Sequence, residues 1–372
     1  MKLGDFCDFE GGSQPPKSEF VFETKSGYVR FLQIRDFGSD KNITYIPEAK
    51  KNRLCKESDI LIGRYGASVG KILTEKAGAY NVALMKTIPN FEVLDRGWFY
   101  NYLISDEFQV RLLNIADRSA QAGFSKEDIF NFPVPVPPLP EQQRIVGILD
   151  AAFDGIATAK ANAEQNLQNA RALFESHLQS VFTQRGEGWG KAQLASCCDH
   201  IFAGGDVPKD RVSQQPTPRY SVPIFANGEK DDGLYGFTDV ARVTKPSVTI
   251  SARGTIGFTA IRTEPFLPVV RLIVLTPNEQ TIGLSFLYYA LRGMDFENTG
   301  TSIPQLTVPN IKERMIYLPP ISQQGSIVAK LDALSEETQR LASLYQRKLA
   351  ALAELKKSLL HQAFTGQLTI GN

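Results

Sequence analysis

The sequence has only four cysteines among its 372 residues, and it lacks any long apolar run. So few cysteines, without the spacing of a disulfide framework, favour the reducing cytoplasm over a secreted, disulfide-stabilised fold. No apolar run approaches the roughly 20 residues that a membrane-spanning helix requires. The N-terminus also lacks a signal-peptide pattern. We therefore expect a cytoplasmic protein that does not span a membrane.

The chain also lacks an excess of charge of either sign, because 41 Lys and Arg residues balance 40 Asp and Glu residues. A protein that coats DNA non-specifically is basic throughout, so this balance argues against that class. The balance is compatible with a sequence-specific DNA-binding protein, in which the positive charge can be confined to one surface.

Residues for catalysis and metal binding are scarce as well. The chain has three histidines, and His177 and His361 fall in segments that we expect to be long helices. Neither a Ser/His/Asp nor a Cys/His arrangement is indicated, and the GxxxxGK[ST] phosphate loop is absent. The Cys-Cys-Asp-His stretch from Cys197 has no second cysteine pair near it, so zinc is not expected. Cys7 and Cys198 are interpreted as small buried residues, and we expect neither a metal nor a cofactor.

What the sequence does have is an internal repeat over most of its length. PPLPEQQRIVGILD begins at Pro137, and PPISQQGSIVAKLD begins 182 residues later at Pro319, with seven of 14 positions identical. The match continues without a gap for 47 residues. Further upstream, YGASVG from Tyr65 corresponds to RGTIG from Arg253. A variable module and a constant segment therefore each occur twice.

Each constant segment predicts one long helix. The stretch FPVPVPPLP, from Phe132, cannot be helical, whereas Pro140 and Glu141 are start signals for a helix. Apolar or small residues then recur every three or four positions, which is typical of one face of a long packed helix. In the first segment these are Ile145, Leu149, Ala152, Ile156, Ala159, Ala163, Leu167, Ala170, Phe174, Leu178 and Val181. In the second segment they are Ile327, Leu331, Leu334, Leu341, Tyr345, Leu349, Leu352, Leu355 and Leu360.

An uninterrupted helix of about 40 residues, about 60 Å long at 1.5 Å per residue, needs a partner for its apolar face. The first segment has many alanines on this face and the second has many leucines, so small side chains of one helix can pack against large ones of the other. The alternative is that each helix lies on its own globular domain.

The two proline-rich junctions, the C-terminal LLHQAFTGQL from Leu359, the GG-containing starts of both modules and the twofold repeat together resemble the DNA specificity (S) subunit of type I restriction–modification systems. The resemblance covers nearly the whole chain. It implies an α+β fold with pseudo-twofold symmetry, in which two long helices form an antiparallel coiled coil and join two globular mixed α/β target recognition domains. The domains would be residues 1–138 and 186–320, and the helices residues 139–185 and 321–372. One departure is Gly325-Ser326, where the first junction has Gln-Arg.

In that family each recognition domain reads one half of a split, asymmetric DNA site, while the helices set the spacing and dock two methyltransferase subunits. The resemblance thus implies a non-catalytic, sequence-specific DNA-binding subunit. Its partners would be double-stranded DNA, two methyltransferase (M) subunits that use S-adenosylmethionine, and restriction (R) subunits that join through the complex. Two other interpretations stay open: an enzyme with unfamiliar motifs, and a scaffold whose modules bind other proteins.

Candidate DNA contacts are polar or basic residues in segments that we expect to be turns and loops. A Gly-rich turn after the apolar stretch DILI contributes Arg64, Tyr65, Ser68 and Lys71, and its counterpart contributes Arg253 and Thr255. The polar loops before the two junctions contribute Ser119 and Gln121, and Thr301, Ser302 and Gln305. The densest basic cluster contributes Lys50, Lys51 and Arg53, and the stretch FANGEK contributes Asn227. The alternative for each group is an ordinary turn, a solvated loop or a solvated charged face.

Overall fold

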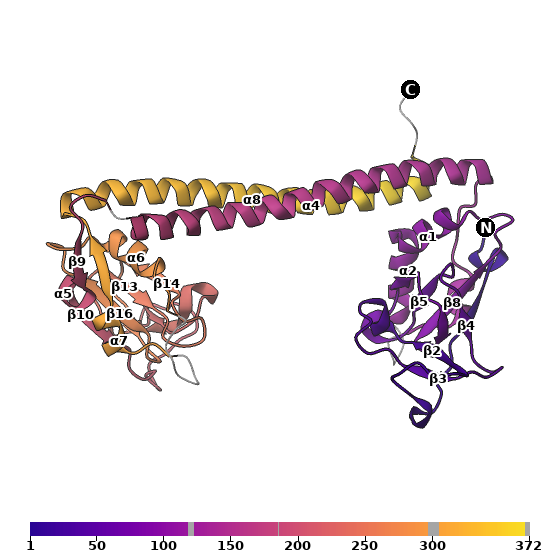
Figure 1. The fold of residues 1–372 in the computed structure, drawn as a ribbon, viewed down its shortest axis with the longest axis horizontal. Coiled ribbons are helices and arrows are strands. Elements are labelled where there is room, and N and C mark those ends of the chain that lie inside the picture. The colour runs from indigo at the N-terminus through magenta and orange to yellow at the C-terminus, as the bar shows by residue number, and fades with distance from the viewer. Residues whose placement is uncertain (118–122, 185, 297–304, 369–372) are drawn as a thin grey trace. The chain divides into compact units, whose positions relative to one another are not determined.

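The computed structural model describes residues 1–117, 123–184, 186–296 and 305–368. The chain forms two compact units, of which the first contains residues 1–163 and 347–372 and the second residues 164–346. Each unit contains one variable module and a part of both long helices (Figure 1). In the described part of the chain, no helix is both long and apolar enough to cross a membrane.

Two small sheets form the first module. The antiparallel sheet has the order β1-β8-β5-β6, with strands Cys7–Gly11, Leu84–Pro89, Leu61–Gly63 and Ile72–Leu73. The second sheet has the order β3-β2-β7-β4, with strands Tyr45–Pro47, Tyr28–Leu32, Gly78–Tyr80 and Leu54–Cys55. In this second sheet the central pair, β2 and β7, is parallel. The helices are α1 (Arg96–Ile104), α2 (Asp106–Ala116) and α3 (Lys126–Phe130), with short 3-10 turns at Leu3–Asp5, Lys17–Glu19, Ile34–Phe37 and Gly66–Ser68.

The second module repeats this arrangement. Its antiparallel sheet has the order β10-β16-β13-β14, with strands Cys198–Ala203, Ile273–Pro277, Ser247–Ile250 and Thr259–Arg262. Its other main sheet has the order β12-β11-β15, with strands Leu234–Thr238, Val222–Phe225 and Leu267–Pro268, and β11 and β15 are parallel. A two-stranded sheet pairs β17 (Met315–Leu318) with β9 (Gly190–Gln193). The helices are α5 (Leu194–Cys197), α6 (Leu284–Arg292) and α7 (Val308–Glu313), and a 3-10 turn spans Lys230–Gly233.

Equivalent residues occupy equivalent places in the two modules. Cys7 lies opposite Pro89 in the first antiparallel sheet, and Cys198 lies opposite Pro277 in the second. Burial raises the pKa of both thiols to about 12, although Cys7 is buried and Cys198 is only half-buried. The prediction of a small buried cysteine is therefore confirmed for Cys7, whereas Cys198 is only half-buried.

The GG-containing start of each module is explained by a close backbone approach. The amide of Gly12 donates to the Leu84 carbonyl at 3.0 Å, and the amide of Gly204 donates to the Leu272 carbonyl at 2.8 Å. A Cβ on Gly12 would lie 2.0 Å from the Asn81 carbonyl oxygen, and one on Gly204 would lie 2.6 Å from a Pro268 backbone carbon. Only glycine fits at these two positions, because backbone on the facing segment cannot move aside.

The two constant segments are long helices, as predicted. Helix α4 spans Leu139–Gln184 with 46 residues, and α8 spans Ile321–Thr365 with 45 residues. At 1.5 Å per residue, α4 is about 69 Å long and α8 about 68 Å. Helix α8 begins before Gly325, so this residue lies inside the first turns of the helix.

The helices pack against each other in both units. In the first unit Ile145 and Leu149, near the start of α4, share a core with Leu360 and Phe364, near the end of α8. In the second unit Leu178, near the end of α4, shares a core with Leu331, near the start of α8, and the pair is therefore antiparallel. The predicted class of two mixed α/β modules with two packed long helices is confirmed, and the alternative of two separate helices is wrong.

The predicted apolar face of α4 is buried or half-buried at every position, whereas the prediction for α8 fails at Leu355. Leu355 is 47% exposed, because steps of four lead from Leu352 through Lys356 to Leu360, and Leu355, five residues before Leu360, lies off that face. Lys356 occupies the position on the packed face that was predicted for Leu355, and its ammonium lies 4.7 Å from the centre of the Phe153 ring.

Candidate nucleic-acid interface

A tight Gly-rich turn joins β5 to β6 in the first module, and an equivalent turn joins β13 to β14 in the second. In the first module the Gly63 amide donates to the Lys71 carbonyl at 2.8 Å, and the Gly70 amide donates back to the Gly63 carbonyl at 3.0 Å. In the second module Ser251, Phe258 and Gly257 make the same pair of bonds, at 2.8 and 3.0 Å. The structure therefore places the two turns, which the sequence repeat relates, in matching positions.

The register of the two turns is fixed by their glycines. Gly66 and Gly254 both have positive φ, 57° and 72°, and each directly follows the residue at the tip of its turn. Tyr65 and Arg253 therefore occupy the same position. Both side chains are exposed, Tyr65 by 38%. The two modules thus present an aromatic phenol and a guanidinium at one equivalent site.

In each module the turn lies beside the loop that precedes the junction. Tyr65 forms an isolated β-bridge with Gly123 in the first module. In the second module the Leu306 amide donates to the Ala252 carbonyl at 3.0 Å. Two segments that the sequence treats as separate candidates therefore form one surface. The loop candidates Ser119, Gln121, Thr301 and Ser302 lie outside the described residues.

The two arginines of the turns have different surroundings. The Arg64 Nε donates to the Phe124 carbonyl at 2.7 Å, so the half-buried Arg64 holds the turn to the loop. Arg253 is exposed, and its Nη2 donates to the Gln305 Oε1 at 2.9 Å. This bond links two candidate residues at the surface and leaves the amide group of Gln305 as a donor.

The remaining candidates of the turns divide in the same way. Lys71 and Thr255 are exposed, as expected of residues that contact a partner. The Ser68 hydroxyl instead donates to the Tyr65 carbonyl at 2.6 Å, which stabilises the turn itself.

Asn227 connects three segments of the second module. Its Nδ2 donates to the Val270 carbonyl at 2.6 Å, and its Oδ1 accepts from the Ala252 amide at 2.8 Å. The neighbouring Gly228 amide donates to the Ser251 hydroxyl at 3.1 Å. Asn227 therefore positions the turn that carries Arg253.

The segment that Asn227 holds includes two residues that the sequence analysis missed. Val270 and Arg271 have φ values of 53° and 65°, in the left-handed region that a β-branched residue rarely adopts. Both are exposed. Such strain persists only where the surrounding structure enforces it, and here the Val270 carbonyl accepts from Asn227 while its amide donates to Gly205. The one signal in the sequence is an arginine inside the apolar stretch LPVVRLIVL.

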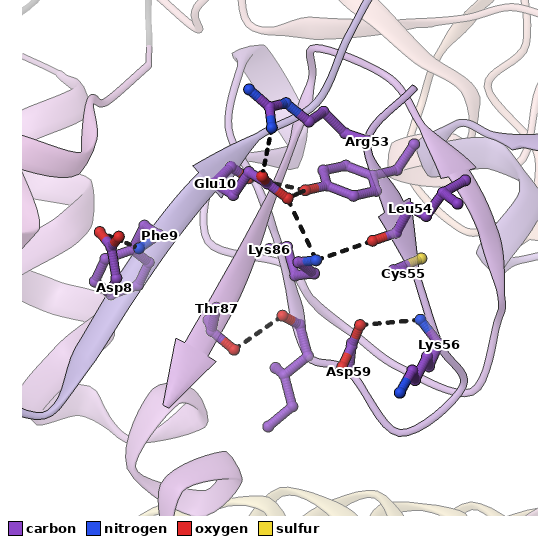
Figure 2. A network of polar contacts seen from close by, with 12 residues as sticks. Asp8, Phe9, Glu10, Arg53, Leu54, Cys55, Lys56, Asp59, Lys86 and Thr87 are labelled. Atoms are coloured by element: carbon purple, nitrogen blue, oxygen red, sulfur yellow. Dashed lines mark hydrogen bonds and ion pairs between the residues drawn. The ribbon is translucent and has the colours of Figure 1, made fainter. Parts of the chain in front are cut away.

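The basic cluster of the first module is exposed at Lys50, Lys51 and Arg53. Figure 2 shows that Arg53 belongs to a polar network centred on Glu10, whose Oε1 accepts from the Arg53 Nη1 at 2.8 Å. The other carboxylate oxygen of Glu10 accepts from the Tyr80 hydroxyl at 2.9 Å and lies 3.3 Å from the Lys86 ammonium.

The charge of Glu10 is stabilised by this network. Partial burial favours the neutral acid, but the hydrogen bonds from Tyr80 and Lys86 and the charges of Lys86 and Arg53 lower the pKa of the Glu10 carboxyl below its ordinary value. Glu10 therefore stays ionised and offsets part of the positive charge of Arg53. Lys50 and Lys51 are better placed than Arg53 to contact phosphates.

In the described ranges, no group of three or more His, Cys, Asp or Glu residues is placed to hold a metal ion. What the two surfaces offer is hydrogen-bond donors: the exposed Lys71, Arg253, Thr255 and Arg271, and the half-buried Gln305. Such side chains suit the base edges and phosphates of nucleic acid.

Comparison with known proteins agrees with this geometry. The model of the type I restriction modification DNA specificity domain matches residues 1–169 and again residues 186–346. A putative type I specificity subunit of Mycoplasma pneumoniae is 31% identical over 198 residues, a match that covers 53% of this chain and 54% of that relative. The chain thus spans about half the length of that curated relative.

Two solved structures share the fold at 20% identity. One comes from work on complex assembly and conformational transition of the type I R-M system, with a TM-score of 0.83 over 99% of this chain and 97% of that one. The other is the HsdS subunit of Thermoanaerobacter tengcongensis, with a TM-score of 0.63 over 99% of this chain and 96% of that one. With a family model that matches both halves in turn, the chain belongs to the type I restriction–modification DNA specificity family.

Proposed function

We propose that this chain is the sequence-specific DNA-binding subunit of a type I restriction–modification complex and has no catalytic residues of its own. Residues 1–138 and 186–320 are the recognition domains in this proposal, and residues 139–185 and 321–372 are the helical spacers. The observation that carries it is the duplicated surface, in which a Gly-rich turn is held against the pre-junction loop once in each module.

Each recognition domain reads one half of a bipartite site. Tyr65 in the first domain and Arg253 in the second occupy the same position on their turns, so the two domains present different chemistry to DNA. A guanidinium pairs well with the O6 and N7 of guanine in the major groove, whereas a phenol cannot form that bidentate contact. Different half-sites, and therefore an asymmetric site, follow from this difference.

In the second domain we include Arg271 in the DNA-contacting surface. Its backbone is held in a strained conformation, and the same Asn227 side chain fixes both this segment and the turn of Arg253. In the first domain Lys71, Lys50 and Lys51 supply the positive charge for phosphate contacts.

The helix pair sets the distance between the half-sites. One helical turn of DNA is roughly 34 Å long, so a helix of about 69 Å is long enough to span two half-sites that lie one turn apart. The repeated junctions and helices give two equivalent places on one chain, which suits two methyltransferase subunits. Restriction subunits then join through that complex, in the cytoplasm where the DNA lies.

A selection from random-sequence DNA tests the proposal, carried out with the chain assembled with its methyltransferase subunits. We expect enrichment of two short motifs separated by a constant gap. A protein-binding scaffold, the competing function, enriches no sequence, and that result would remove the proposal.

The substitution Arg253→Ala tests the turn of the second domain. We expect binding to the preferred site to weaken by about 1–3 kcal/mol, with relaxed preference at one base position of one half-site, because a base-reading arginine discriminates at a single position. Competition binding against single-base variants of the site measures both effects.

The matched control is Arg64→Ala, since the Arg64 Nε bonds to the Phe124 carbonyl inside its own module. We expect this change to lower the stability of the first module without relaxing any single base position. Uniform weakening across all DNA sequences in Arg253→Ala would instead assign Arg253 to a phosphate contact.

A further inference from the structure

A buried glutamine lies at the same place in both junctions. Gln142 and Gln324 are equivalent positions of the repeat, one in PPLPEQQ and the other in PPISQQG. Their side chains lie in the first turns of α4 and α8 and are 0% and 2% exposed. Burial of an uncharged amide is costly unless each of its polar atoms has a partner.

In the first unit every polar atom of Gln142 has a partner on the backbone. Its Oε1 accepts from the Asp95 amide at 2.7 Å. Its Nε2 donates to the Val93 carbonyl at 2.8 Å and to the Pro137 carbonyl at 2.8 Å.

In the second unit Gln324 makes the same three contacts. Its Oε1 accepts from the Gly283 amide at 2.8 Å. Its Nε2 donates to the Thr281 carbonyl at 3.0 Å and to the Pro319 carbonyl at 3.1 Å. The same three bonds occur at both junctions although the modules differ in sequence, so the two glutamines have the same structural role.

The three bonds join the long helix to its recognition domain, and the orientation of one on the other affects the spacing of the DNA contacts. Asp95 and Gly283 are the residues that precede the first turn of α1 and of α6. Pro137 and Pro319 end the extended segments that lead from each module into its long helix. One side chain therefore connects the long helix, the segment that leads into it, and the start of α1 or α6.

Only a glutamine matches this arrangement. It supplies one acceptor and two donors from a side chain long enough to reach all three backbone groups. A glutamate at the same place would set a carboxylate oxygen against two carbonyl groups, and a methionine would leave three backbone groups without a partner.

We propose that Gln142 and Gln324 are positioning residues that fix the angle between each recognition domain and its helix, and that they thereby determine how strictly the complex selects the gap between half-sites. This inference rests on the proposed function. The DNA-contacting turn of each module is carried on the same core as α1 or α6, so a change of angle at the glutamine moves the whole surface relative to the helix.

The test uses the full chain assembled with its methyltransferase subunits, carrying Gln142→Met, Gln324→Met or both. The DNA set keeps both half-sites and varies the gap by one and two base pairs in each direction. We expect the preference for the correct gap to fall about tenfold, which corresponds to about 1.4 kcal/mol, while the base preference within each half-site stays unchanged. Hydrogen exchange at the Asp95 and Gly283 amides should become faster in the same variants.

Gln143 and Gln323 provide matched controls, because each is an exposed glutamine adjacent in sequence to one of the buried glutamines. Gln143→Met and Gln323→Met should keep the full gap preference. If a methionine variant does not fold, Gln142→Asn and Gln324→Asn keep the amide but shorten its reach, and they should show the same loss of gap preference.

Two outcomes overturn the inference. If a variant is less stable but keeps the wild-type gap preference, the glutamines stabilise the fold without affecting how the gap is selected. A variant that loses base preference and gap preference together makes them part of the reading surface. A wild-type complex with no sequence preference at all is a different result, since it removes the proposed function, and the exchange rates at Asp95 and Gly283 then show only whether the bonds exist.

Discussion

Deleting one heptad from each long helix is expected to shorten the preferred gap in the DNA site by about three base pairs. Residues 157–163 of α4 and 347–353 of α8 are suitable, because Ala157 lines one apolar groove with Leu349, Leu352 and Ala353. Seven helical residues correspond to about 10.5 Å at 1.5 Å per residue, and successive base pairs are 3.4 Å apart. Both half-site sequences should stay as they are, because the helices contact no bases in the proposed arrangement.

Selection from random DNA measures this outcome directly, and the original site should then bind no better than non-specific DNA. The control is Gly155→Ala, a change within α4 at a position with no neighbouring atoms within 4 Å, which keeps the helix length and favours the helix. A changed half-site sequence after the deletion, or an unchanged gap, would refute the spacing role of the helices.

The substitution Phe364→Ala is expected to destabilise the first module. The Phe364 ring lies 5.2 Å from that of Trp98 and 5.6 Å from that of Tyr102, and the residue is only 5% exposed. Replacing a buried phenylalanine by alanine costs about 3–5 kcal/mol of unfolding free energy. Urea unfolding, followed by hydrogen exchange in α1, measures the loss.

Phe182 provides the equivalent change in the second unit. Its ring lies 5.5 Å from that of Phe286 and 6.2 Å from that of Trp189, so the end of each long helix packs against the module of its own unit. Leu355→Ala is the control, since Leu355 is 47% exposed and should change stability by no more than about 0.5 kcal/mol. A first module as stable in Phe364→Ala as in the control would show that the end of α8 is dispensable for it.

The long helices were predictable from the sequence because one physical property, the spacing of apolar residues, controls them. The prediction failed at Leu355, where an apolar residue lies off the packed face and the Lys356 ammonium lies over the Phe153 ring instead. Spacing rules count apolar side chains, and they do not register a lysine whose ammonium lies over an aromatic ring.

The candidate site was predictable only in part. The Gly-rich turns emerged from the repeat, but their contact with the pre-junction loops joins residues about 60 positions apart, as in the bond from Arg64 to Phe124. No local pattern distinguishes that arginine from an exposed one. The strain at Val270 and the links made by Asn227 likewise depend on which strands are neighbours, and this is decided by the tertiary fold.

The roles of Gln142 and Gln324 at the junctions were likewise not predictable from the sequence. The repeat singles out both glutamines, yet a conserved spacing alone suits an exposed helix residue equally well. Only the six backbone contacts give Gln142 and Gln324 a role.

Mapping methylated bases across the host genome at single-base resolution tests the central claim most directly. The claim is that two different DNA-reading modules are held at a set distance by one pair of helices. It predicts that methylation dependent on this chain falls in a single motif of two unlike halves with a constant gap. Chain-dependent methylation in an uninterrupted motif or in halves with variable separation would contradict it, and so would the loss of no methylated motif when this chain is deleted.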